Sequence, residues 1–337
     1  MSGNPVAPRH LVLPLGDAAR NLAVEEVLFR TLPPGHPGLF LLWRNEPAVI
    51  VGRHQCVADE VDMAAAEREG VPVVRRITGG GAVFHDAGTL CFSWIRHDAG
   101  MGPAFAPLLA QVAAALADVG VPARLTGRND LEAAGRKISG SAQFRSGGRL
   151  LVHGTLLVRT DLVRMGRLLT PGAAKRRAHG VASVRARVGN AADLWAAGSS
   201  MEGLHAALLA RCAPEAEPPD AGLGRMAELL AGRKYRSPDW NRDASTAATR
   251  ALARRFPWGG VELRLALREG RIRDCRVTGD FFSDGGVEAL ERRLEGCPAE
   301  ADAVRRALEG LAWERTFLGC EAEAMRDFFI SAARGGS

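Results

Sequence analysis

The sequence predicts a two-domain protein of the α+β class, with a mixed α/β first domain over residues 1–243 and a small α+β second domain over residues 244–337. Before residue 235, short apolar runs bounded by Gly or Pro alternate with amphipathic helical patterns. A break over residues 235–243 then precedes a hairpin pattern and two helical patterns. With 337 residues, of which 47% are hydrophobic, the chain is long enough to bury a core in each domain.

Helical patterns of the first domain begin at residues 17–31, where Asp17 can cap the first turn. Further helices are expected over residues 61–69, 104–119, 161–169 and 201–212. Strands are expected over residues 39–43, 48–51, 71–78 and 90–95, with a β-pair over 137–144 and 150–159. In the second domain we expect a hairpin over residues 261–267 and 272–277, followed by helices over 286–294 and 299–308.

Composition argues against a membrane or secreted protein. No apolar run approaches the roughly 18 to 20 residues that span a bilayer, and residues 1–15 lack the pattern of a signal peptide. The six cysteines show neither a Cys-x-x-Cys pair nor a zinc-type spacing, which is typical of buried thiols in a reducing compartment. We therefore expect a cytoplasmic protein.

Positive charge is concentrated in the first domain. The net charge is +6, but residues 255–337 hold 13 Lys/Arg against 15 Asp/Glu, which leaves +8 on residues 1–254. Residues 133–192 contain 12 Lys/Arg and a single acid, Asp161. Such a stretch attracts phosphates, nucleic acid or an acidic protein. Aromatic interleaving and DNA-binding motifs are missing from it, so nucleic acid is not the expected partner.

The first candidate site is the loop that begins at Arg76 and contains Gly79, Gly80 and Gly81. Three glycines after a strand expose backbone N–H groups that suit an anionic ligand, and Arg76 can reach a phosphate or carboxylate with a forked hydrogen bond. The loop is neither a Walker A motif nor a Rossmann fingerprint, because both spacings are missing. A tight turn without function remains the alternative.

The second candidate lies on the expected strand at residues 137–144. Lys137, Ser139 and Ser141 share one face of such a strand, and Ile138 takes the other. A lysine there can neutralise the charge that develops when a carboxylate attacks a phosphate. Asn129 and Asp130 offer oxygen ligands for Mg²⁺ accompanying ATP. A solvated lysine on an edge strand is the alternative.

Two further features are ambiguous alone. His153 follows an apolar strand pattern and is either a buried, hydrogen-bonded group or a catalytic one. The basic stretch over residues 170–187 is either a cover for a nucleotide or a solvated surface run.

Taken together, these segments resemble the lipoate–protein ligase family in its two-domain bacterial form, over nearly the whole chain. The resemblance is carried by residues 21–26, 41–45, 76–86, 127–130, 135–142, 153–157 and 180–187, while residues 258–263 are similar to the family's accessory domain. Each motif is weakly specific, but their order is strongly so. The resemblance implies a mixed-sheet catalytic domain of the biotin/lipoate ligase-like fold and a small C-terminal α+β accessory domain.

The resemblance implies that ATP, with Mg²⁺, converts lipoate into lipoyl-AMP, and that the lipoyl group then passes to a carrier lysine. Lys137 would contact the carboxyl and phosphate oxygens in both steps, and Asp130 would serve the metal. The residues implied to bind lipoate or the adenylate are Trp43, Arg76, Thr78, Gly79, Gly80, Gly81, Ala82, Phe84, His85, Asn129, Ser139, His153, Gly154, Thr155, Gly180, Val181, Ser183 and Val184.

The partners implied are acidic apo lipoyl domains, namely the E2 subunit of 2-oxoacid dehydrogenases, the glycine cleavage H protein or a related carrier. A first domain with a charge of +8 would steer them in. Neither nucleic acid nor a membrane is an expected partner. The chain departs from the family's usual pattern at Cys56, Thr89 and Arg145.

Other functions remain compatible with these residues. A cysteine-independent lipoyl or octanoyl amidotransferase on the same scaffold would move the acyl group between carriers. A transferase that forms an acyl-thioester is not expected, because no cysteine lies between Cys91 and Cys212. A scaffold that binds lipoyl-AMP or a carrier without turnover would keep its function after Lys137→Ala, whereas an enzyme would lose ligation.

Overall fold

The computed structural model describes residues 7–98, 100, 102–170, 188–218, 220–241 and 248–334. Its strands are β1 (Arg9–Gly16), β2 (Leu39–Asn45), β3 (Ala48–Val51), β4 (Val73–Arg75), β5 (Val83–His85), β6 (Thr89–His97), β7 (Arg124–Thr126), β8 (Asp130–Ala133), β9 (Arg136–Ser146), β10 (Arg149–Leu157), β11 (Glu215–Ala216), β12 (Arg250–Phe256), β13 (Gly259–Arg268) and β14 (Arg271–Gly279). Its helices are α1 (Ala18–Thr31), α2 (Val57–Glu60), α3 (Met63–Arg68), α4 (Ala106–Asp118), α5 (Leu162–Leu168), η1 (Ala191–Leu194), α7 (Met201–Cys212), α8 (Leu223–Leu230), η2 (Ala231–Tyr235), α9 (Pro238–Asn241), α10 (Val287–Leu294), α11 (Ala301–Ala307), α12 (Trp313–Thr316) and α13 (Ala322–Arg334). Within these ranges no helix has the length and apolar character needed to cross a membrane.

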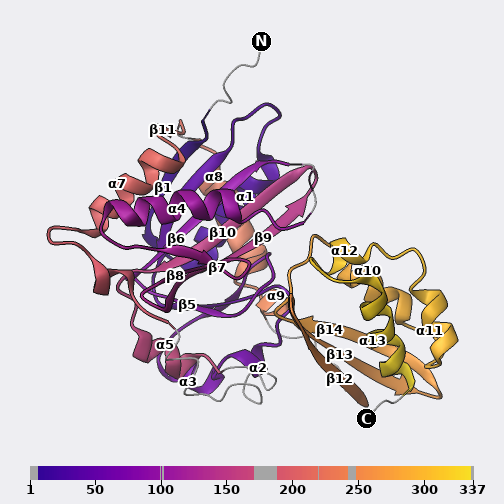
Figure 1. The fold of residues 1–337 in the computed structure, drawn as a ribbon. Helices are drawn as coiled ribbons and strands as arrows, with labels where there is room; N and C mark the ends of the chain where they lie inside the picture. The colour runs from indigo at the N-terminus through magenta and orange to yellow at the C-terminus, as the bar shows by residue number, and fades with distance from the viewer. Residues whose placement is uncertain are drawn as a thin grey trace.

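An eight-stranded mixed sheet forms the centre of the larger part of the molecule, in the order β11-β1-β2-β6-β10-β9-β8-β7. Strand β1 runs parallel to β2 and β11, while the pairs from β2 to β7 are antiparallel. A second sheet, β4-β3-β5, lies below it, and the sheet β12-β13-β14 belongs to the smaller part beside it (Figure 1). The mixed sheet and the small α+β unit confirm the predicted fold class.

Most expected elements form, and the differences have local causes. Helix α1 begins after Asp17, whose side chain accepts a hydrogen bond from Ala19 N–H at 2.7 Å. The helix expected over residues 61–69 is only α3, because Val61 is extended and Asp62 caps the helix; α2 ends before this range, at Glu60. The strand expected over residues 71–78 is only β4, since the chain leaves the sheet after Arg75. Six strands have no counterpart among the expected elements, namely β1, β5, β7, β8, β11 and β12.

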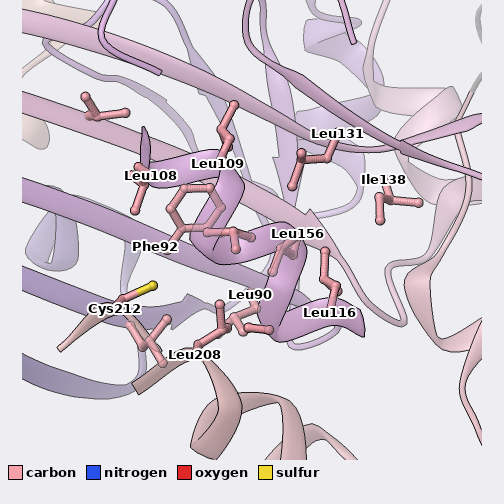
Figure 2. Close-up of a cluster of buried hydrophobic side chains, with 14 of the residues drawn as sticks. Leu90, Phe92, Leu108, Leu109, Leu116, Leu131, Ile138, Leu156, Leu208 and Cys212 are labelled. Atoms are coloured by element: carbon pink, nitrogen blue, oxygen red, sulfur yellow. The ribbon is translucent and has the colours of Figure 1, made fainter. Parts of the chain in front are cut away.

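The eight-stranded sheet is buried on both faces because its strands alternate between two cores. Phe40 and Leu42 of β2 pack in one core with α4 and α7, whereas Leu41 and Trp43 pack in the other with α1. Figure 2 shows the first core, where leucines of α4 lie close to Leu208 of α7.

The smaller part has its own core and also contributes to that of the larger part. Strand β13 buries Val261, Leu263 and Leu265 together with apolar residues of α10, α11 and α13. Phe282, by contrast, joins the core around α4, where its ring centroid lies 5.5 Å from that of Phe105. This aromatic contact anchors the smaller part against the larger one.

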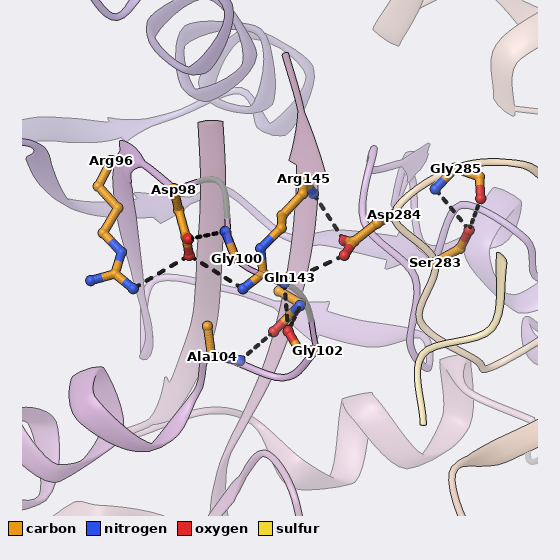
Figure 3. Close-up of polar contacts among 10 residues, drawn as sticks. All are labelled: Arg96, Asp98, Gly100, Gly102, Ala104, Gln143, Arg145, Ser283, Asp284 and Gly285. Atoms are coloured by element: carbon orange, nitrogen blue, oxygen red, sulfur yellow. Dashed lines mark hydrogen bonds and ion pairs between the residues drawn. The ribbon is translucent and has the colours of Figure 1, made fainter. Parts of the chain in front are cut away.

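A buried polar network joins the two parts (Figure 3). The backbone N–H of Arg145 donates to Asp284 Oδ1 at 3.1 Å, and its guanidinium Nη1 lies 3.4 Å from Asp284 Oδ2. The same guanidinium reaches Asp98 at 3.3 Å. Burial raises the pKa of Asp284 even though Arg145 acts to lower it, so desolvation outweighs the attraction. The main effect of the network is therefore to fix the orientation of the two parts. Its net contribution to the free energy of unfolding is small.

Removing one member of this buried pair should be costly. Asp284→Ala leaves the Arg145 guanidinium buried with one carboxylate fewer, so we expect the free energy of unfolding to fall by roughly 3 kcal/mol. Asp302→Ala removes the partner of an exposed arginine, Arg305, and should cost less than about 1 kcal/mol. Urea denaturation measures both variants, and equal effects would contradict this account of the interface.

Candidate active site

A cavity of about 690 Å³ lies where β9, β10 and the glycine loop (residues 76–82) meet the smaller part. Lys137, Gly80 and Gly81 are on its wall together, and the smaller part contributes Trp258 and Phe282. Its volume lies in the range of roughly 300 to 1,000 Å³ that is typical of small-molecule sites. The residues that we expected at the site and that line this cavity are Trp43, Arg76, Gly80, Gly81, Ala82, Phe84, His85, Asn129, Asp130, Lys137, Ser139, His153, Gly154 and Thr155.

Six further residues were expected at the site. Thr78 and Gly79 are described but are absent from the cavity wall. The other four belong to the basic stretch, and they lie outside the described residues: Gly180, Val181, Ser183 and Val184.

Lys137 reaches the cavity because of the alternation along β9. Lys137, Ser139 and Ser141 line the cavity while Ile138 is buried in the core, as expected for one strand face. The ammonium Nζ forms an ion pair with Asp130 Oδ1 at 2.9 Å. It passes directly over Gly140, where an added Cβ would lie 3.1 Å from Nζ. A glycine at position 140 therefore leaves room for the amine above the strand.

Two buried hydroxyl groups on this wall lack partners. Ser139 and Ser141 are only 1% and 6% exposed, and neither Oγ has a hydrogen-bond partner in the part of the chain that the structure describes. Buried polar atoms are nearly always hydrogen-bonded, so both hydroxyls are suited to a ligand. Gly154 keeps this space open, because a Cβ there would lie 2.6 Å from Ser141 Oγ and 2.5 Å from the Phe92 ring.

The glycine loop differs from the expected open anion cradle. A Cβ at Gly79 would lie 2.1 Å from the carbonyl oxygen of Phe281, so this glycine permits close approach of the smaller part. The N–H of Gly80, a residue with a φ of 87°, donates to the same oxygen at 3.3 Å. Gly79 therefore lies against the smaller part and the Gly80 N–H has a structural partner, while ligand binding by these glycines stays a prediction.

Arg76 is committed to the loop itself. Its guanidinium donates to the carbonyl oxygens of Gly79 at 2.5 Å and Gly81 at 2.9 Å, and to Thr78 Oγ1 at 2.9 Å. Burial lowers the pKa of Arg76 to about 10, which still leaves it charged at neutral pH. The forked contact that we expected with a ligand is thus used to hold the loop in shape, although Arg76 also lies on the cavity wall.

A buried hydrogen-bonded chain runs from this loop to helix α1. Thr78 Oγ1 lies 2.7 Å from His153 Nε2, and His153 Nδ1 lies 2.9 Å from Glu25 Oε1. Because a carboxylate only accepts, His153 is assigned the tautomer with the proton on Nδ1, and Thr78 donates to Nε2. The same Glu25 oxygen accepts from Ser93, whose hydroxyl in turn accepts from the Trp43 indole at 2.9 Å. We call these residues the Glu25 chain.

Glu25 was missed by the sequence analysis as a site residue. It is 1% exposed, although it lies on the helix face that also buries Leu22. A carboxylate on an apolar helix face is rarely buried unless it has partners. That pattern is the signal that could have identified it.

His85 is buried and neutral. Asn45 Nδ2 donates to its Nδ1 at 2.9 Å, which places the ring proton on Nε2. Burial, followed by the charge of Arg76, lowers the pKa of His85 to about 3. The ring therefore presents a neutral edge to the cavity at physiological pH.

The hairpin of β7 and β8 brings acidic and basic groups to the cavity. Asn129 donates through Nδ2 to the Ser141 carbonyl at 2.6 Å, which leaves its Oδ1 for other partners. Asp130 and Glu132 lie on the same wall. Arg128, which we had not predicted, stacks its guanidinium 4.9 Å from the Phe282 ring centroid. Across the described ranges, no cluster of three or more His, Cys, Asp or Glu side chains could hold a metal by itself.

The depressed pKa of His85 predicts a pH dependence of stability. An unfolded histidine takes up a proton near its ordinary pKa of about 6.5, whereas folded His85 resists until about pH 3. Stability should therefore be lost as the pH falls from about 6.5 towards 3. His54, with a pKa also lowered to about 3 by burial, acts in the same direction. In urea titrations from pH 7 to 5, His85→Asn should show a shallower loss than the wild type, and parallel curves would contradict this.

Two family models match the chain. Residues 17–213 match the lipoyl protein ligase A/B catalytic domain, and residues 245–329 match the bacterial lipoate protein ligase C-terminus. The lipoate-protein ligase LplJ of Bacillus subtilis is 33% identical over 311 residues, which cover 90% of this chain and 94% of the relative.

Solved structures agree in fold. LipL1 of P. falciparum in complex with lipoate has a TM-score of 0.77 and 21% identity, covering 96% of this chain and 98% of that one. A bipartite lipoate protein ligase of Thermoplasma acidophilum, studied with its E2 lipoyl domain, has a TM-score of 0.64 and 29% identity, covering 70% of this chain and 96% of that one. A lipoate-protein ligase A bound with ATP has a TM-score of 0.60 and 27% identity, covering 70% of this chain and 98% of that one. The chain belongs to the lipoate–protein ligase family.

Proposed function

We propose that this protein is an ATP-dependent lipoate–protein ligase. The observation that carries the proposal is the shared cavity, in which the Lys137 amine, the glycine loop and two serine hydroxyls without partners among the described residues surround one space. The relative named as a lipoate-protein ligase and the related structures with lipoate or ATP support lipoate and ATP as substrates.

The cavity suits both parts of an acyl-adenylate. Leu22, Trp43 and Ile50 form an apolar stretch of the wall, which fits an acyl chain. Lys137, Asn129 and Asp130 form a polar stretch, which fits phosphate groups. We infer that the acyl carboxylate lies between these two stretches, within reach of Lys137.

Lys137 stabilises charge in both steps of the proposed reaction. In the first step a carboxylate oxygen of lipoate attacks the α-phosphorus of ATP, and pyrophosphate leaves. In the second, the carrier lysine amine attacks the acyl carbon, loses a proton, and AMP leaves. The ammonium would exchange its ion pair with Asp130 for the oxygens that gain negative charge.

Mg²⁺ is proposed at the polar stretch of the wall. Mg²⁺ usually takes one or two carboxylates together with substrate phosphates, and Asp130 with Glu132 and the Asn129 Oδ1 meets that donor requirement. When bound, the ion would neutralise the phosphates of ATP. Asp130, released from Lys137 by the substrate, would then be available to hold it.

The proposed partners are acidic apo lipoyl domains, namely the E2 subunit of 2-oxoacid dehydrogenases, the glycine cleavage H protein or a related carrier, met in the cytoplasm. Support comes from the Thermoplasma ligase that was studied with its E2 lipoyl domain and from the charge of +8 on residues 1–254. We retain residue 243 as the boundary between the catalytic and accessory domains, since the two family matches lie on either side of it.

A transferase is the less favoured function. The only cysteine on the cavity wall, among described residues, is Cys91. Burial and then the charge of Glu25 raise the pKa of its thiol well above the ordinary value, so a nucleophilic thiolate does not form at neutral pH. The curated relative also bears the name of a ligase. An amidotransferase without a cysteine nucleophile would release no pyrophosphate from lipoate and ATP.

Lys137→Ala should abolish ligation without unfolding the protein. Loss of one cation that stabilises developing charge costs roughly 100-fold or more in turnover. The side chain is 39% exposed, so little core packing is lost. Arg136→Ala, a neighbouring substitution on the opposite strand face, should retain activity. The assay weighs an apo lipoyl domain by mass spectrometry after incubation with ATP, Mg²⁺ and lipoate. Full ligation by Lys137→Ala would overturn the proposal.

Glu25→Gln should impair binding of the acyl substrate. Glutamine keeps one acceptor oxygen but removes the buried charge and places an N–H donor where Oε2 lies 3.0 Å from His153 Nδ1, so the Glu25 chain is weakened at a buried position. A lost buried hydrogen bond of about 1 to 3 kcal/mol predicts a roughly 5- to 150-fold fall in kcat/KM for lipoate in a pyrophosphate-release assay.

Glu26→Gln is the matched control for this variant. Glu26 is equally buried in α1 but pairs with Lys234 and Tyr235, which do not line the cavity. Replacing Glu26 should lower the thermal stability, because a buried pair is lost. The kcat/KM should stay within about twofold of the wild type, because the partners of Glu26 lie outside the cavity. Equal kinetic effects of the two substitutions would show that the Glu25 chain has no special role.

A further inference from the structure

A second cavity, of about 270 Å³, lies between the two parts of the molecule and behind the glycine loop. The larger part contributes Arg53, Gln55 and Arg75 to its wall, and the smaller part contributes Arg264, Arg276 and Glu291. None of these six lines the catalytic cavity. The reaction proposed above therefore leaves this cavity unexplained.

Gln55 presents a buried amide donor to this cavity. The residue is 2% exposed, and its Oε1 accepts a hydrogen bond from Gly52 N–H at 2.8 Å. This bond fixes the orientation of the amide, because the reversed orientation would place two donors against each other. The Nε2 amine therefore faces the other way, and it has no hydrogen-bond partner within the described ranges.

Arg276 presents a second donor on the opposite wall. Its Nη1 reaches Glu291 at 3.5 Å and its Nη2 reaches Asp274 at 3.5 Å. Its Nε, however, is buried and finds no partner anywhere in the described part of the chain. The amide of Gln55 and the guanidinium of Arg276 thus offer unused N–H groups from the two parts of the molecule.

Two of the three acidic groups on the wall, Glu288 and Glu291, are already engaged. Arg53 Nη2 donates to Glu288 at 2.8 Å, and the backbone N–H of Val277 donates to Glu291 at 2.8 Å. The neighbouring His54 is neutral at physiological pH, since burial lowers its pKa to about 3. The wall holds four arginines and three acids, and an acceptor with several oxygens would suit the two N–H groups that lack partners within the described ranges.

We propose that this cavity is a binding site for a small anion, a phosphate or a carboxylate, that bridges Gln55 and Arg276. The site would also support the catalytic cavity. Arg53 N–H donates to the Thr78 carbonyl at 2.8 Å, and an added Cβ at Gly52 would lie 2.1 Å from the Gly80 carbonyl oxygen. An anion held by Gln55 would therefore stiffen residues 52–55, on which the glycine loop rests.

Isothermal titration calorimetry on the full chain tests the site with inorganic phosphate and, separately, succinate. We expect one saturable site for at least one of these anions, and the anion that binds more tightly identifies the chemistry. Gln55→Glu keeps the acceptor for Gly52 but replaces the free donor with a carboxylate, so binding should weaken at least tenfold. Arg276→Gln should have a similar effect.

Two control variants separate this site from the catalytic cavity. Arg273→Gln removes an exposed arginine from the same strand, and Lys137→Ala removes the catalytic cation; both should retain binding. Absence of saturable binding to either anion would overturn the proposal, as would binding lost in Lys137→Ala but kept in Gln55→Glu. If Gln55→Glu and Arg276→Gln fail to fold by circular dichroism, crystals of the wild type soaked in arsenate decide: an anomalous peak between Gln55 and Arg276 supports the site, and its absence there contradicts it.

Discussion

The cavity wall depends on one buried carboxylate. Glu25 supplies a negative charge in the interior, and this charge favours the protonated form of the buried Arg76 guanidinium. They are linked by His153, which uses both ring nitrogens, and by Thr78, whose hydroxyl accepts from Arg76 and donates to His153. Without such a counter-charge, a buried guanidinium would be very unfavourable. The shape of the glycine loop therefore originates in helix α1, far from it in sequence.

This arrangement explains how a loop without a phosphate-binding fingerprint can line the proposed nucleotide site. Arg76 holds the carbonyl oxygens of Gly79 and Gly81 on one side, while the smaller part packs on Gly79 and Gly80 from another. The loop is thus rigid before any ligand arrives, which reduces the entropy lost on binding. Lys137 is the contrasting element: it is partly exposed, and its ammonium pairs with Asp130, a partner that it can exchange for a ligand.

Much of the site was predictable because local patterns determine it. The alternation along β9 predicts that Lys137 and Ser139 share a face, and Asp17 predicts the start of α1. Contacts between distant segments were not predictable in the same way. Arg76 binds carbonyl oxygens further along its own loop. Gly79 contacts Phe281, and Glu25 pairs with His153, through tertiary packing of segments that are distant in sequence. A single sequence carries no signal for such partners beyond a charged residue at an apolar position.

The central claim is that Lys137 and the glycine loop enclose one acyl-adenylate. A crystal structure with a hydrolysis-resistant sulfamoyl analogue of lipoyl-AMP tests it most directly. We predict that the acyl chain lies along Leu22, Trp43 and Ile50, and that Lys137 Nζ leaves Asp130 to contact the linkage between the acyl and nucleotide groups within hydrogen-bond distance. An analogue bound outside this cavity, or a Lys137 that remains on Asp130 and away from that linkage, would contradict the account.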